Sequence, residues 1–253
     1  MRMNSLVRGI LRRTQARILE AIDLGAIAAP TPGELSRTLE TWTGVVARTD
    51  ARNRLSLDFD MLRIQALQDV HKVAPGRTLQ DALTQVASSV ATVNAKAVTS
   101  ITGINVRAAS GLGARIDMFR DRNVSLITSL VGNQIDDVQK LLESSEATGL
   151  QVEELRAQIE ERFGVSESKA DLLARDQTLK LAGQITEARQ RGAGVERYVW
   201  TTSGDERVRE EHAALEGQVF SWDNPPEPGH PGEDFQCRCT AFPVIAEFDG
   251  DEG

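Results

Sequence analysis

Apolar side chains recur at helical spacing through most of the chain. Residues 4–28 predict an amphipathic helix in which Leu6, Ile10 and Ile18 lie among arginines. From Asp121 the pattern sharpens into one long helix that ends near Thr148 and Gly149. Its predicted inner face consists of Val124, Ile127, Leu130, Val131, Ile135, Val138, Leu141 and Leu142.

Proline, glycine and capping residues set the ends of the other predicted helices. Helices are expected over about 31–51 and 58–73, the first opened by a capping-box pattern and the second closed at Pro75-Gly76. Another should open at Thr78. Residues 100–113 contain three glycines and predict a flexible junction.

Two further helices are expected after the long one. A short helix should run over about 152–164 and end at Gly164. Ser166 should cap the next, which stops near Gly192 and Gly194. Residues 1–194 are therefore expected to be almost wholly helical.

The pattern changes at Val195. Residues 196–202 are rich in β-formers and predict a strand, and 240–245 predict a last one. Between them a short polar helix is expected over 205–215, and four prolines exclude regular structure from 221–236. The predicted fold class is mainly α, with an extended helical N-terminal region and a small α+β module at the C-terminus. The predicted divisions are 1–114, a basic helical region; 115–194, a helical domain; 195–246, the small module; and 247–253, an acidic tail.

Charge is distributed unevenly along the chain. Residues 1–120 hold 16 Lys and Arg against 10 Asp and Glu, whereas residues 121–253 hold 13 against 27. The first 17 residues contain five arginines, and no acid precedes Glu20. This favours binding to DNA or to an acidic partner, and the alternative is a solvated face. The candidate binding residues are Arg8, Arg12, Arg13 and Arg17.

No stretch of the sequence has the roughly 20 apolar residues needed to span a bilayer, and no signal-peptide core follows the N-terminal arginines. The protein is therefore expected in the reducing cytoplasm where it is made. Its two cysteines, Cys237 and Cys239, are accordingly expected to be ligands or free thiols rather than a disulfide.

Two of the three histidines and both cysteines lie within 28 positions near the C-terminus. His212, His230, Cys237 and Cys239 supply the donor set of a tetrahedral zinc site, which we expect to be structural. Their spacing is not that of a standard zinc finger. The alternative is that the histidines make hydrogen bonds and the thiols act as small buried apolar groups.

The same region carries a family resemblance. One stretch resembles a sequence motif of the Mu F-like phage head-morphogenesis proteins. It runs from Trp200-Thr201 through 205–217 and contains, in order, Asp205, Arg207, Val208, Arg209, His212, Leu215 and Gly217. The Pro228-Gly229-His230-Pro231 loop and Cys237-Arg238-Cys239 follow in the same order. Upstream, 122–127 and 174–178 are similar to that family's helices, so that the resemblance covers about residues 115–245.

The resemblance implies a minor head protein at the portal vertex of a bacteriophage, acting in head morphogenesis and in DNA packaging or ejection rather than as an enzyme. Its partners would be the portal protein, other head proteins and packaged DNA, and it would be found in the virion. Residues 1–114 lie outside the resemblance. Two alternatives remain: a metal-dependent hydrolase that uses the His/Cys cluster, and a DNA-contacting packaging factor that uses the N-terminal arginines.

Overall fold

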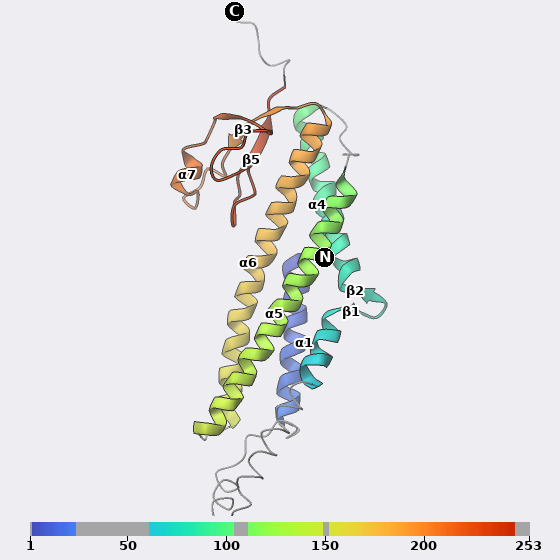
Figure 1. The fold of residues 1–253 in the computed structure, drawn as a ribbon, viewed down its shortest axis with the longest axis vertical. Coiled ribbons are helices and arrows are strands. Elements are labelled where there is room, and N and C mark those ends of the chain that lie inside the picture. The colour runs from blue at the N-terminus through green and yellow to red at the C-terminus, as the bar shows by residue number, and fades with distance from the viewer. Residues whose placement is uncertain (1, 24–60, 104–110, 149–151, 246–253) are drawn as a thin grey trace, which may run out of the picture. The chain divides into compact units, whose positions relative to one another are not determined.

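The computed structural model describes residues 2–23, 61–103, 111–148 and 152–245 (Figure 1). These residues form two compact units, each assembled from separate stretches of the chain. One unit contains residues 4–79 and 124–171, and the other contains 1–3, 80–123 and 172–253. The helix expected over 31–51 and the acidic tail lie outside the described residues.

The first unit is a set of packed helices. It contains nearly all of α1 (Met3–Asp23), the helical residues 61–70, and parts of α5 (Leu112–Thr148) and α6 (Val152–Gly192). The apolar face predicted for the long helix is largely confirmed, because Ile127, Val131, Ile135, Val138, Leu141 and Leu142 are buried. Helix α5 begins earlier than expected, at Leu112, so the glycine-rich junction covers fewer residues than the sequence indicated.

A short β-hairpin stands where only helices were expected. Strands β1 (Lys72–Ala74) and β2 (Arg77–Thr78) pair antiparallel across Pro75-Gly76. Gly76 has a φ of 68°, a conformation that glycine adopts without a steric penalty. The prediction that strands appear only after Val195 was therefore wrong, because the Pro-Gly pair turns the chain back on itself instead of merely ending a helix.

Helix α6 is continuous over 41 residues, which corrects the predicted break at Gly164. Gly164 is exposed within the helix, and a Cβ atom at this position would meet nothing within 4 Å. Ser166 does not cap a new helix. Its hydroxyl is buried and donates a hydrogen bond to the side-chain carbonyl of Gln134 on α5.

The second unit contains α4 (Leu79–Thr102), the beginning of α5, the later part of α6 and the small C-terminal module. The module has one three-stranded antiparallel sheet in the order β4-β3-β5. Strand β3 (Arg197–Thr201) is central, flanked by β4 (Val219–Ser221) and β5 (Thr240–Pro243). Within the described residues 195–245, the only regular helix is α7 (Glu210–Ala213), which is much shorter than the helix expected over 205–215.

The described residues confirm the predicted fold class, mostly helical with small antiparallel sheets, the larger of them near the C-terminus. Among these residues, no helix combines the length and the apolar character needed to cross a membrane.

Candidate metal centre

Alternation along β3 builds the core of the module. Tyr198 and Trp200 point to one face of the sheet and are fully buried. They pack with Trp222 and with both cysteines. The cysteines therefore lie in the apolar core of the module, with exposed fractions of 3% for Cys237 and 8% for Cys239.

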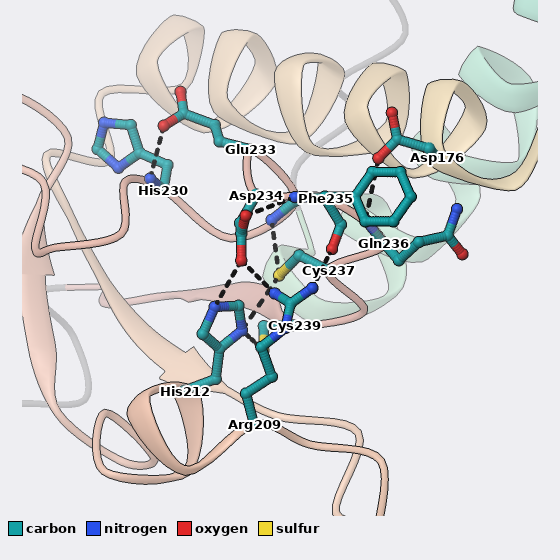
Figure 2. A network of polar contacts seen from close by, with 11 residues as sticks. Asp176, Arg209, His212, His230, Glu233, Asp234, Phe235, Gln236, Cys237 and Cys239 are labelled. Carbon is teal, nitrogen blue, oxygen red and sulfur yellow. Dashed lines mark hydrogen bonds and ion pairs between the residues drawn. The ribbon is translucent and has the colours of Figure 1, made fainter. Parts of the chain in front are cut away.

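The module is fastened to the later part of α6. Gln190 donates a hydrogen bond to the Ala241 carbonyl at 2.9 Å and accepts one from Trp222 Nε1 at 3.2 Å. Asp176 accepts a hydrogen bond from the Gln236 backbone N–H at 2.9 Å (Figure 2). These contacts fix the loop that precedes the cysteines against a rigid helix.

Three of the four predicted ligands come together. His212, on α7, turns its Nδ1 atom to 3.6 Å from Cys237 Sγ and 3.4 Å from Cys239 Sγ (Figure 2). All three ligand atoms lie within 4.8 Å of one another, and all three residues are buried. We call these three residues the Cys/His cluster.

The spacing of the cluster fits a zinc ion. Zinc binds sulfur at about 2.3 Å and imidazole nitrogen at about 2.0–2.1 Å, so tetrahedral angles separate such a pair of donors by roughly 3.5–3.6 Å. The two nitrogen–sulfur distances in the cluster, 3.6 and 3.4 Å, agree with this value. Two thiols and an imidazole are also donors that favour zinc, whereas magnesium and calcium favour oxygen ligands.

Groups outside the cluster are arranged to support charged ligands. His212 Nε2 is buried without a hydrogen-bond partner, but an Asp234 carboxylate oxygen lies 3.3 Å away on the side of the ring opposite the two sulfurs. The Gly232 N–H donates a hydrogen bond to Cys237 Sγ at 3.4 Å. The buried Trp200 Nε1 has no conventional hydrogen-bond partner, and it interacts with the Cys239 sulfur. A donor buried in this way is best satisfied by a thiolate.

The two thiols affect each other's ionisation in opposite directions. The hydrogen bond from Cys239 is the largest cause that lowers the pKa of Cys237, to about 5. The same contact, together with burial, raises the pKa of Cys239. Because the charge on one thiolate disfavours a second charge beside it, a bound dication would favour release of a proton from the pair.

His230, the fourth predicted ligand, is not part of the cluster. Its Nδ1 lies 2.9 Å from the Tyr198 hydroxyl, and its ring packs against Tyr198 and Trp222. Its backbone N–H donates a hydrogen bond to Glu233 at 2.8 Å (Figure 2). His230 therefore has the hydrogen-bonding role that the sequence left open as the alternative.

The N-terminal arginines are engaged within the first unit. Helix α1 packs its apolar face inward, and the arginines that flank this face reach acidic residues on neighbouring helices. The ion pairs are Arg8 with Asp171, Arg12 with Glu167 and Arg17 with Asp69, and Arg13 donates to the Lys72 carbonyl at 3.4 Å. The Arg12 hydrogen bond lowers the pKa of Glu167. These contacts offset much of the positive charge on which the predicted binding role depended.

Sequence reasoning missed Asp234 and two ion pairs beside the cluster. Arg209 pairs with Asp234, and Asp205 pairs with Arg238. The hydrogen bond from Arg238 lowers the pKa of Asp205 to about 2. No spacing rule marks these pairs, because a loop of irregular structure separates their members.

Comparison with known proteins identifies the class to which this arrangement belongs. Residues 136–242 match the family model described as Phage Mu protein F like protein. An uncharacterized protein of Haemophilus influenzae (strain ATCC 51907 / DSM 11121 / KW20 / Rd) is 37% identical over 149 residues. The match covers 57% of this chain and 33% of the length of that protein. No solved structure matches the chain.

The later helices and the cysteine-containing module of this mostly helical chain thus coincide with a stretch that matches a family of phage proteins. Residues 136–242 are a Phage Mu protein F-like domain, and the family is one of phage head morphogenesis proteins. This finding confirms the resemblance seen in the sequence.

Proposed function

We propose that this chain is a minor head protein that acts at the portal vertex, in head assembly and in DNA packaging or ejection. The observation that supports the proposal is the F-like domain, which includes the end of α5, all of α6 and the module up to Phe242. The proposed partners are the portal protein and other head proteins, and the proposed location is the virion.

The test is to purify procapsids and mature virions from an infection and to measure this chain in each by quantitative mass spectrometry. We expect a few copies per procapsid, and we expect procapsids assembled without portal protein to lack the chain. The proposal would be contradicted if this chain were abundant in the lysate but absent from both procapsids and mature virions. Equal incorporation with and without portal protein would contradict the portal assignment alone.

We further propose that the Cys/His cluster holds a zinc ion that stabilises the module. The support is the agreement between the nitrogen–sulfur distances and tetrahedral zinc, together with the donors that surround both sulfurs. Protein purified without a histidine tag should contain close to one zinc per chain by elemental analysis. The Cys239→Ser variant should contain less than about 0.2. Zinc below that value in the unmodified protein would contradict the proposal.

A further inference from the structure

A cavity of about 310 Å³ opens beside the Cys/His cluster. All three residues of the cluster line it, together with Ser203, Val208 and Gln236. The rest of its lining consists of four arginines: Arg175, Arg207, Arg209 and Arg238. Among the described residues, no aspartate or glutamate contributes to this lining.

The charge of the arginines is only partly compensated. Asp234 and Asp205, the acids next to the cavity, already pair with Arg209 and Arg238. Among the described residues, no ion pair within 4 Å involves the side chain of Arg175 or Arg207, and Arg207 interacts only at longer range with Asp205. A zinc ion bound to two thiolates is neutral, so it would not reduce the positive potential of the cavity. The cavity is therefore suited to an anion.

The metal centre leaves a coordination position for that anion. Within the part of the chain that the structure describes, no other His, Cys, Asp or Glu brings a ligand atom into the group formed by Nδ1 and the two sulfurs. Tetrahedral zinc takes four ligands. A metal held by the cluster would therefore have a fourth position open to a group that enters through the cavity, since the three proposed ligands all lie on its wall.

We propose that this cavity binds a phosphate group, held by Arg175 and Arg207 and able to fill the fourth position of the metal. The inference rests on the metal centre proposed above. Guanidinium groups match the oxygens of phosphate with two parallel hydrogen bonds, and phosphate carries more charge than a single carboxylate. The volume exceeds that of a bare ion, so the phosphate can be part of a nucleotide or of a nucleic acid strand.

The test uses the full chain loaded with Co²⁺, whose visible absorption reports the ligands of the metal. Inorganic phosphate is titrated at constant ionic strength, which separates specific binding from screening. We expect a saturable change in the cobalt spectrum with phosphate, and none with acetate at the same concentration. Arg207→Gln and Arg175→Gln should each weaken phosphate binding by about tenfold or more. Arg162→Gln, which changes an exposed arginine of α6 outside the cavity, should leave it unchanged.

Two further titrations identify the source of the phosphate. A short single-stranded oligonucleotide with a 5′ phosphate is compared with the same oligonucleotide without it. Equal binding of both indicates recognition of a phosphodiester, and binding of the first alone indicates a terminal or free phosphate.

The outcomes separate the two proposals. A cobalt–thiolate spectrum that does not respond to phosphate or to either oligonucleotide would overturn the phosphate site and leave the metal centre in place. A response that the Arg207 and Arg175 variants do not weaken would also overturn it. A protein that binds no cobalt at all would overturn both.

Discussion

The two ring nitrogens of His212 face different neighbours, and this difference defines the role of the residue. Nδ1 faces two sulfurs, whereas Nε2 faces the carboxylate of Asp234. A carboxylate on one side orients an imidazole and increases its basicity as a metal ligand on the other. His230 has no such pair of neighbours, because an aromatic hydroxyl and two aromatic rings surround it.

This contrast gives a prediction for two matched variants. His212→Ala should abolish zinc binding, whereas His230→Ala should keep close to one zinc per chain. His230→Ala should still lower the free energy of unfolding by about 1–2 kcal/mol, because it removes a hydrogen bond to Tyr198 and the packing of a ring. Elemental analysis and urea unfolding measure the two effects.

Circular dichroism serves as the control, because both variants should keep the helical signal of the parent protein. Loss of zinc from a folded His230→Ala protein would show that His230 belongs to the metal site after all.

At the scale of single residues, the sequence indicated the three residues that come together in the Cys/His cluster. Cysteines and a histidine within one short stretch indicate a metal site, however the loop that connects them folds. The choice between His212 and His230 could not be made, because it depends on how a proline-rich loop folds. Asp234 was missed for the same reason, since its partners are 22 and 25 residues away in the sequence.

The earlier and later parts of helix α6 contact different parts of the chain. Its earlier part packs in the first unit, where Ser166 meets Gln134, and its later part carries the module. In that second interface, Gly183 lies directly against the Pro231-Gly232 backbone. A Cβ atom at Gly183 would lie 2.7 Å from the Pro231 carbonyl oxygen.

Two glycine variants of this helix should therefore shift stability in opposite directions. Gly164→Ala should raise the free energy of unfolding by roughly 0.5–1 kcal/mol, because a Cβ there meets nothing within 4 Å and alanine favours the helix. Gly183→Ala should lower it by about 1–2 kcal/mol, because the added methyl must push a backbone carbonyl aside. Urea denaturation of the two proteins provides the comparison, and a gain in stability from both would show that the loop does not press on the helix.

At the scale of elements, periodicity predicted the helical faces well and the breaks between helices poorly. The apolar face of α5 depends only on residue spacing, and most of it is buried as expected. Gly164 and Ser166 suggested a break, but the helix continues through both, and the buried Ser166 hydroxyl bonds to Gln134 instead of capping a new helix. Pro75-Gly76 was recognised as an end of a helix, yet the pairing of β1 with β2 depends on both flanks of the turn.

For the whole molecule, the two compact units differ in what holds them together. The first depends on apolar helix faces and on ion pairs between helices. The C-terminal module has a small core in which both cysteines take part, and the proline-rich loop adds little apolar area of its own. Fold class could be predicted from the sequence at this scale, because helical and β-rich stretches are cleanly divided near Val195 except for one hairpin.

Removal of the metal should accordingly affect one region of the molecule. A chelator should speed hydrogen exchange over about residues 205–239 by roughly tenfold or more, while α1 and the buried face of α5 keep their protection. Cys239→Ser should exchange rapidly in that region from the start, and the chelator should have no further effect on it. Uniformly faster exchange in both units would instead indicate that the metal supports the entire fold.

The two hydrogen bonds of Gln190 also bear on which piece of this protein can be excised. A fragment that starts at Val195 would leave the Ala241 carbonyl and the Trp222 indole without their partner, and would expose the core that α6 covers. A fragment that starts near Leu172 retains Asp176, Gly183 and Gln190 together. During synthesis this later part of α6 also leaves the ribosome before the module does. The helix is therefore available as a template on which the strands, the loop and finally the cysteines can assemble.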